Sequence, residues 1–248
     1  MTHAVRTRLA LLDGLSLHQQ DVHGRPIEVP VLPHGVQRLV AFLALSGRPG
    51  RSAVAGQLWP ETSELQARRT LRTALWRVQK LVPGLVGTAG GAVMLPAHVQ
   101  VDVRELTEWS RRALVPGAPI EDWSPDSAAL HGELLPGWYD DWVLLERERL
   151  RQLRMHAWEA LSEKLVRAGR HGEAIEAAHE AIRAEPLRES AHLALIRAHA
   201  AEDNVGVALL AYHRFEQRLY GELGIAPSPH LTALVRGLRR TPVPYPRG

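Results

Sequence analysis

The first thirty residues alternate between short apolar runs and turn residues. Apolar or alternating stretches cover residues 8–12, 15–18 and 27–29, and they are separated by Asp13-Gly14 and by the His-Gly-Arg-Pro segment at 23–26. Short runs of this kind between turn signals are typical of antiparallel strands. The pattern therefore predicts three short antiparallel strands.

The next stretch has helical periodicity and predicts three helices. Pro33 opens the first helix, which stops at the Gly-Arg-Pro-Gly turn of residues 47–50. Ser52 is expected to cap the second helix, which Pro60 ends. Residues 61–63 (Glu-Thr-Ser) carry the start signal of the third helix.

The third helix is strongly amphipathic. Its apolar side suits a protein core and consists of Ala67, Leu71, Ala74, Leu75, Val78 and Leu81. At 100° per residue, the opposite side carries polar and basic residues, namely Arg69, Arg72, Thr73, Trp76 and Lys80, with Arg68 and Arg77 flanking them. One helix thus combines a core-facing stripe with a basic face.

A hairpin around Ala89-Gly90-Gly91 and a further strand near 99–101 follow this helix. Strands, three helices and a closing hairpin form the order of a winged helix-turn-helix domain. The sequence therefore predicts an α+β, OmpR-like winged helix-turn-helix domain over residues 6–103. An α-helix fits the DNA major groove, so the basic face of the third helix is the candidate for DNA contact.

Charge distribution favours the same helix. The formal net charge is only +3, but residues 65–101 contain five basic residues and no acidic one. Such an island is expected of a polyanion-binding element, although a solvated helix face is an equal interpretation on charge alone. Trp76 has two interpretations: stacking on a sugar or a thymine methyl group, or packing against the hairpin. Packing is the favoured one.

The second half of the chain is helical and repetitive. From Leu106 onward strand-like runs vanish, and a set of positions recurs thirty-four residues later: Trp158, Leu161, Leu165, Ala174, Ile175 and Ala178 return as His192, Leu195, His199, Ala208, Leu209 and Tyr212. This is the tetratricopeptide (TPR) period. We expect an all-α TPR-like domain over 104–240, with the helices of residues 133–154 capping its stack, and a flexible Pro-rich tail at 241–248.

Several functional classes find no support in the sequence. The chain has no cysteine, no apolar run long enough to span a bilayer, and no recognisable nucleophile, dinucleotide or phosphate-loop motif. His192 and His199 share one side of a helix but have no carboxylate at ligand spacing, so packing or groove-lining is favoured over metal binding. We expect a cytoplasmic protein that is not an enzyme and has neither cofactor nor metal.

Specific stretches resemble the SARP-type antibiotic regulatory proteins of actinomycetes. The winged-helix match rests on three runs: residues 32–45, Gln57-Leu58-Trp59-Pro60 and Leu71-Arg72-Thr73-Ala74-Leu75-Trp76-Arg77-Val78. The second half resembles their bacterial transcriptional activator domain through residues 133–138, Asp141-Trp142, 146–151, 185–192 and 222–229. The resemblance extends from about Arg6 to Leu238.

The resemblance implies a transcriptional activator, such as one controlling a biosynthetic gene cluster. It implies binding to tandem direct repeats near a promoter, with double-stranded DNA and RNA polymerase holoenzyme as partners. By position, Arg69, Arg72, Thr73 and Lys80 become base or phosphate contacts. The helical domain is implied to support assembly and activation.

The closing hairpin departs from the family pattern, since residues 81–103 contain neither arginine nor lysine. DNA contacts from this wing would be limited to the backbone amides of Gly90 and Gly91. Fewer ion pairs would make binding by a single copy weak and salt-dependent. A homodimer on two adjacent sites would compensate through effective concentration.

Two other functions compete with this one. In the first, the TPR-like domain is an interaction adaptor that binds a partner peptide, and the winged domain has lost DNA binding. In the second, a small molecule binds in a TPR groove near Trp158, His192 and His199.

Overall fold

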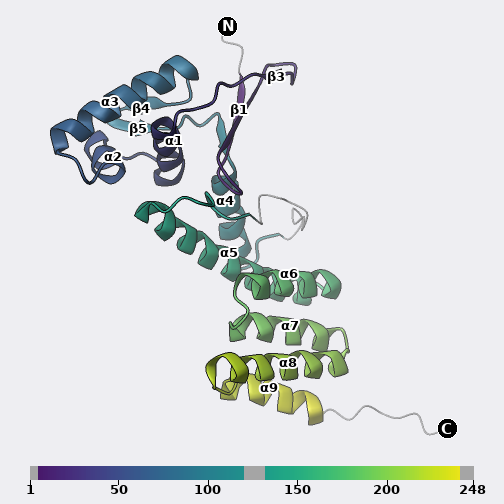
Figure 1. Cartoon of the computed structure of the whole chain (residues 1–248). Coiled ribbons are helices and arrows are strands. Elements are labelled where there is room, and N and C mark those ends of the chain that lie inside the picture. The colour runs from purple at the N-terminus through teal and green to yellow at the C-terminus, as the bar shows by residue number, and fades with distance from the viewer. Residues whose placement is uncertain (1–4, 120–131, 241–248) are drawn as a thin grey trace. The chain divides into compact units, whose positions relative to one another are not determined.

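The computed structural model describes residues 5–119 and 132–240, which form two compact units (Figure 1). Residues 5–108 and 132–150 make up the first unit. Residues 109–119 and 151–240 make up the second. The expected tail at 241–248 lies outside the described residues. No helix in the described part combines the length and apolar character needed to cross a bilayer.

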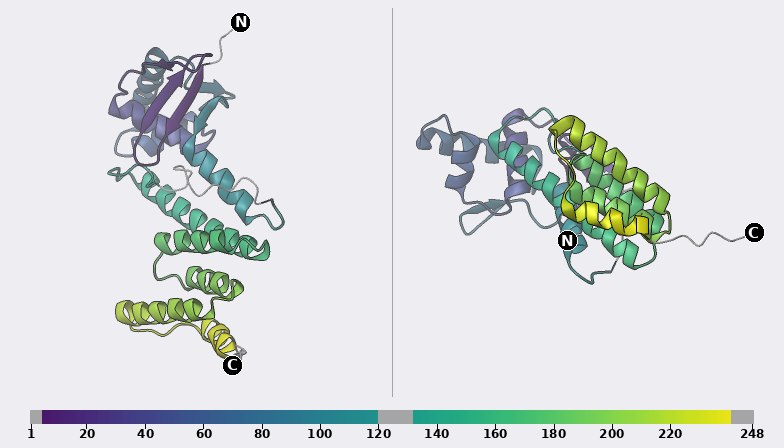
Figure 2. Two further views of the ribbon diagram at one scale, coloured as in Figure 1. Left: turned by 90° about the vertical axis from the view of Figure 1, so that its right-hand side faces the viewer. Right: turned by 90° about the horizontal axis from the view of Figure 1, so that it is seen from below.

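The first unit contains a four-stranded sheet in the order β3-β2-β1-β6. β1 (Arg6–Ala10) pairs antiparallel with β2 (Ser16–Gln20), which pairs antiparallel with β3 (Pro26–Ile27). This confirms the three expected strands, and β1 and β2 are seen side by side in Figure 2, left. β6 (Val99–Val101) pairs with β1 in parallel and so brings a strand from far along the chain into the same sheet.

Three helices pack against one another, as expected: α1 (His34–Ser46), α2 (Arg51–Leu58) and α3 (Glu64–Leu81). Their shared core consists of fully buried leucine and valine side chains, among them Leu39, Leu43, Val54, Leu58, Leu71 and Val78. Ser52, expected to cap α2, does not do so. Gly50 is the N-cap residue, and no side chain bonds the first turn, because α2 begins one residue before Ser52.

A two-stranded hairpin follows α3 and completes the winged helix. It consists of β4 (Gly87–Ala89) and β5 (Ala92–Met94), which pair antiparallel. The backbone N–H of Val93 donates to the carbonyl of Pro49 at 3.0 Å, so the hairpin is fixed to the loop before α2. The predicted order of strands, three helices and hairpin is confirmed.

A buried carboxylate links the end of the winged helix-turn-helix domain to its first strand. Asp102 is the first residue of α4 (Asp102–Leu114) and is 4% exposed. Its Oδ2 accepts the backbone N–H groups of Leu11 at 2.8 Å and Leu12 at 2.9 Å, and its Oδ1 accepts that of Val103 at 2.7 Å. One buried side chain thus satisfies three backbone donors and holds the start of α4 to the residues that follow β1.

Residues 132–150 also belong to the first unit. The expectation that residues 133–154 cap the repeat stack is therefore wrong for most of that segment. Leu134 forms a bridge with Leu12, and the N–H of Leu135 donates to the carbonyl of Leu11 at 2.9 Å. These contacts make residues 132–150 part of the winged unit. The compact units therefore differ from the predicted division of the chain between residues 103 and 104.

Arginine side chains hold the same segment. The guanidinium of Arg147 donates to the carbonyls of Leu134, Leu135 and Trp138 at 3.0–3.2 Å, and Arg38 of α1 forms an ion pair with Asp140. Arg147 thus supplies donors to three backbone carbonyls of this turn, and that of Leu135 also accepts the N–H of Trp138 at 3.1 Å. The non-helical residues 134–140 are thus held by the side chains of both Arg38 and Arg147.

The second unit is a stack of helices. It contains the latter part of α5 (Asp141–Arg167), followed by α6 (His171–Ala184), α7 (Glu189–Ala201), α8 (Val205–Leu223) and α9 (Pro229–Arg240). α6 and α8 begin thirty-four residues apart, which confirms the predicted repeat period. Figure 1 shows α6 to α9 lying in successive layers.

The turns inside the two repeats share a backbone conformation. Gly169, between α5 and α6, has φ +72°, and Asp203, at the corresponding position between α7 and α8, has φ +61°. This left-handed region favours glycine, and aspartate is among the few other residues that tolerate it. The second repeat therefore keeps the turn although it has lost the glycine.

Candidate nucleic-acid interface

The predicted recognition helix α3 is fixed by its start and by its inner side. Ser63 is the N-cap residue, and its hydroxyl accepts the backbone N–H of Gln66 at 3.4 Å, as the start signal predicted. The buried residues of the inner side are Ala67, Leu71, Ala74 and Val78, four of the six predicted. Leu75 and Leu81 are half-buried.

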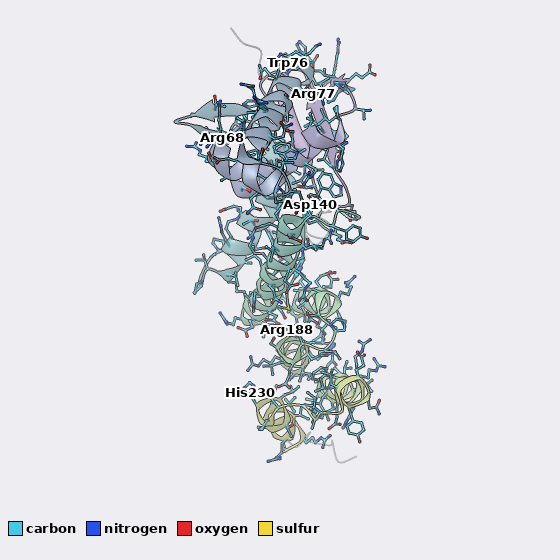
Figure 3. The ribbon with its side chains drawn as sticks, turned by 60° about the vertical axis from the view of Figure 1, so that its left-hand side comes forward. Arg68, Trp76, Arg77, Asp140, Arg188 and His230 are labelled. Atoms are coloured by element: carbon cyan, nitrogen blue, oxygen red, sulfur yellow. The ribbon has the colours of Figure 1, made fainter. Side chains whose placement is uncertain are left out.

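The opposite side of α3 is exposed over its whole length. Every α3 residue proposed for DNA contact is exposed: Arg68, Arg69, Arg72, Thr73, Trp76, Arg77 and Lys80. Figure 3 marks Arg68, Trp76 and Arg77 along the helix. The structure thus brings these residues together on one helix, where they can reach a common ligand.

The side chains on this side differ in how far they are already engaged. Arg68 forms an ion pair with Glu64 at 2.6 Å and donates to the hydroxyl of Ser52 at 3.2 Å. The hydroxyl of Thr73 donates to the carbonyl of Arg69 at 3.2 Å, so its proton is used within the helix. Among the described residues, the guanidinium groups of Arg69 and Arg72 have no partner and are free to bind a ligand.

Trp76 does not pack against the hairpin, and this expectation is wrong. Its side chain is 61% exposed, and the ammonium group of Lys80 lies 5.2 Å from the centroid of its ring. The two residues are four positions apart, a spacing that places side chains next to each other on a helix. A cation–π contact therefore holds the indole on the outer side of α3.

Arg51 is a further candidate that the sequence did not indicate. A hollow of about 460 Å³ lies between α2 and α3 and is lined by Arg51, Ser52, Arg68, Leu71, Arg72 and Leu75. Three guanidinium groups from two helices border it, which is a suitable arrangement for a phosphate group. Arg51 precedes Arg68 by seventeen positions, so only the packing of the two helices reveals the association.

The hairpin turn presents backbone amide groups but no charged side chain. Gly90 and Gly91 have φ +57° and +81°, the two positive values of a type I′ turn, and both residues are exposed. The neighbouring strand buries Val93 completely. The tip therefore has no side chain for a phosphate, as the sequence predicted from the absence of arginine and lysine.

The candidate groove residues of the second unit lie mainly in its interior. Trp158 is 1% exposed and its ring centroid is 4.8 Å from that of Trp109. His192 is 8% exposed, stacks on Phe215 with a centroid separation of 4.0 Å, and has its Nε2 2.9 Å from the carbonyl oxygen of Pro186. These two side chains form part of the packing and do not line an open groove. His199 is half-buried.

Burial also changes the acid–base behaviour of the histidines. Burial is the main cause that lowers the pKa of His192; the hydrogen bond to the carbonyl of Pro186 opposes it, and Arg218 and His179 lower the pKa further. The pKa values of His179 and His199 are also lowered, again chiefly by burial. Burial therefore favours the neutral form of these three imidazoles.

The helical part of the chain decides its family. The model of the bacterial transcriptional activator domain matches residues 101–239, more than half of the chain. The chain belongs to this family. With the winged helix-turn-helix of the first unit, it is a SARP-type transcriptional regulator.

A solved structure shares the fold of this SARP-type regulator. It is Mycobacterium tuberculosis EmbR in complex with a low-affinity phosphopeptide, with a TM-score of 0.68 and 24% sequence identity over 96% of this chain. The match covers 66% of the EmbR chain, so this chain spans less than two thirds of that protein. No curated protein matches the sequence.

Proposed function

We propose that this SARP-type regulator is a sequence-specific DNA-binding activator that uses α3 as its recognition helix. The observation that carries the proposal is the free, exposed pair Arg69 and Arg72 on the side of α3 that faces away from the core. Arginine can bond guanine O6 and N7 together through its planar fork. Arg69 and Arg72 are therefore the candidates for reading bases.

The remaining cations of α3 are assigned to the DNA backbone. Arg68 is already oriented by Glu64 and Ser52, and together with Arg51 of α2 it can hold a phosphate in the hollow between the two helices. A phosphate in this hollow would fix the position of the helix on the duplex without reading sequence. Arg77 and Lys80 flank the base-reading side and suit the same role.

The wing contributes little charge, and this bears on the mode of binding. Contacts through the amides of Gly90 and Gly91 would add no counterion release, so one copy would bind weakly. A homodimer on tandem direct repeats would raise the effective concentration of the second copy. The regulator would then aid recruitment of RNA polymerase holoenzyme to a promoter of a biosynthetic gene cluster, in the cytoplasm.

The test is DNA binding by the full chain and by single variants. Mobility shifts on promoter fragments from its own gene neighbourhood should give a salt-sensitive complex. Arg72→Ala should weaken it by ~1–3 kcal/mol and relax specificity if Arg72 contacts a base. Arg214→Ala, which removes an exposed arginine of α8, is the matched control and should bind as the wild type does.

Two results would count against the proposal. The first is the absence of a salt-sensitive complex with every fragment tested. The second is equal affinity of the wild type, Arg72→Ala and Arg69→Ala for a fragment that is bound. In the second case the winged unit would bind DNA through another surface.

A further inference from the structure

Two apolar side chains interrupt the basic side of α3. Leu65 is 62% exposed and Trp76 is 61% exposed, although both side chains are large and apolar. They lie eleven positions apart, and with Arg69 and Arg72 they fall within a narrow angular range at 100° per residue. The surface proposed to face the bases is therefore partly apolar.

Exposed apolar area at this place calls for an apolar partner. Burial of such area stabilises by ~25 cal/mol per Å², and an indole is one of the largest side chains that can gain from it. Within the major groove, adenine, guanine and cytosine present polar edges, whereas thymine also presents its C5-methyl group. The methyl group is the one apolar feature that a base edge offers there.

The position of Lys80 limits how the indole can bind. Its ammonium group, 5.2 Å from the ring centroid, occupies one side of the indole. Trp76 is nevertheless 61% exposed, so much of the residue can still meet a ligand. A stacked cation would also favour the nearby phosphates, so the pair suits an apolar contact on a base with phosphates on both sides of it.

We propose that Trp76 is a specificity-determining residue that reads the C5-methyl group of a thymine in the major groove. The inference rests on the proposed function of α3 and deepens it. Arg69 and Arg72 then read guanine by hydrogen bonding, and Trp76 selects thymine by shape and apolar contact.

The experiment separates the methyl group from every other property of thymine. A duplex is selected from random sequence with the full chain at fixed salt. Each thymine within its protected region is then replaced, one at a time, by deoxyuridine, which lacks only the methyl group. Fluorescence anisotropy gives the affinities of the wild type, Trp76→Ala and the control Tyr139→Ala, which removes another exposed aromatic ring (80% exposed) of the same unit.

We expect one deoxyuridine position to weaken wild-type binding about fourfold, which corresponds to ~0.8 kcal/mol for a methyl-sized group at 1.4 kcal/mol per tenfold change. The same replacement should leave the affinity of Trp76→Ala unchanged, because the partner of the methyl group is already gone. Tyr139→Ala should respond as the wild type does. Circular dichroism and thermal unfolding check that Trp76→Ala stays folded, as expected for an exposed position.

Each other result overturns the inference in a distinguishable way. An equal loss with deoxyuridine in the wild type and in Trp76→Ala would assign the methyl contact to another residue. A uniform loss in Trp76→Ala on every duplex, without any effect of deoxyuridine, would make Trp76 a sugar–phosphate contact. If Trp76→Ala binds every duplex with the wild-type affinity, the indole does not contact DNA and is available for a protein partner. If no duplex is enriched, DNA binding itself fails, and the inference fails with it.

Discussion

The indole of Trp142 meets the phenyl ring of Phe42 edge-on, with ring centroids 5.4 Å apart and an interplanar angle of 89°. Phe42 lies on α1 and Trp142 at the start of α5, one hundred positions later. Both side chains are buried. The core of the winged unit is therefore completed by residues that follow the bacterial transcriptional activator domain boundary at residue 101.

Replacing Trp142 by alanine should destabilise the winged unit. A buried Trp→Ala change removes apolar contacts and leaves a cavity, at a typical cost of ~3–5 kcal/mol. Chemical denaturation followed by circular dichroism should show a lower midpoint. Tyr139→Ala, at an 80% exposed position three residues earlier, should leave the midpoint within about 0.5 kcal/mol of the wild type. Similar effects of the two variants would contradict the assigned role of the Phe42–Trp142 contact.

Arg51→Gln should reduce the salt dependence of DNA binding. If a phosphate occupies the hollow between α2 and α3, loss of one phosphate contact lowers the slope of log K against log salt by ~1 and weakens all duplexes about equally. Titrations at several salt concentrations measure this slope. Arg214→Gln on α8 is the control, and an unchanged slope in Arg51→Gln would place the phosphates elsewhere.

The stability of the helical stack should fall as the pH drops below about 6.5. Burial lowers the pKa of His192 in the folded chain, while histidines of the unfolded chain keep a pKa near 6.5. The unfolded state therefore binds protons first, and the contribution of His192 to stability is complete above that pH and is lost toward the lower, folded pKa. His179 and His199 act in the same direction.

The variant His192→Gln should reduce this dependence on pH. Glutamine does not titrate, so the free energy of unfolding, measured by urea denaturation between pH 5 and 8, should fall less steeply with decreasing pH in the variant. His230→Gln alters an exposed histidine of α9, marked in Figure 3, and is the matched control. A wild-type slope in His192→Gln would show that the other histidines dominate.

The turn residues of the two repeats should respond in opposite directions. Asp203→Gly removes a side chain from a left-handed residue and should stabilise the stack by up to about 1 kcal/mol. Gly169→Ala should destabilise it by about 1 kcal/mol, through backbone strain alone, because a Cβ there would meet nothing within 4 Å. Thermal unfolding of the two variants measures both effects, and a loss of stability in Asp203→Gly would give Asp203 a role beyond the turn.

Local patterns were sufficient to predict most elements of the fold. α3 could be predicted because eighteen residues repeat an apolar stripe, and because Ser63 is followed at the right spacing by a helix. The thirty-four-residue period could be read in the same way, even though Asp203 replaces a glycine. In each case the signal lies within a few turns of one helix or within one repeat.

Contacts between distant segments could not be predicted. β6 has three residues, and its parallel partner Thr7 to Leu9 lies some ninety positions earlier, so neither run identifies the other. The helical pattern is continuous from Asp141 to Arg167. It therefore does not reveal that the helix up to Leu150 belongs to the first unit and the rest to the second. Helical periodicity placed Trp76 correctly but could not show whether its ring turns outward.

The contacts of the Asp102 carboxylate limit where two related chains can be joined in a chimera. The family boundary at residue 101 precedes it by one position, yet the groups that it holds, the amides of Leu11 and Leu12, lie at the end of the first strand. A chimera joined at that boundary would take this carboxylate from one parent and its amide donors from the other. A chimera that keeps these contacts within one parent therefore needs a junction beyond Leu150, so that residues 102–108 and 132–150 are inherited together with the winged helix-turn-helix.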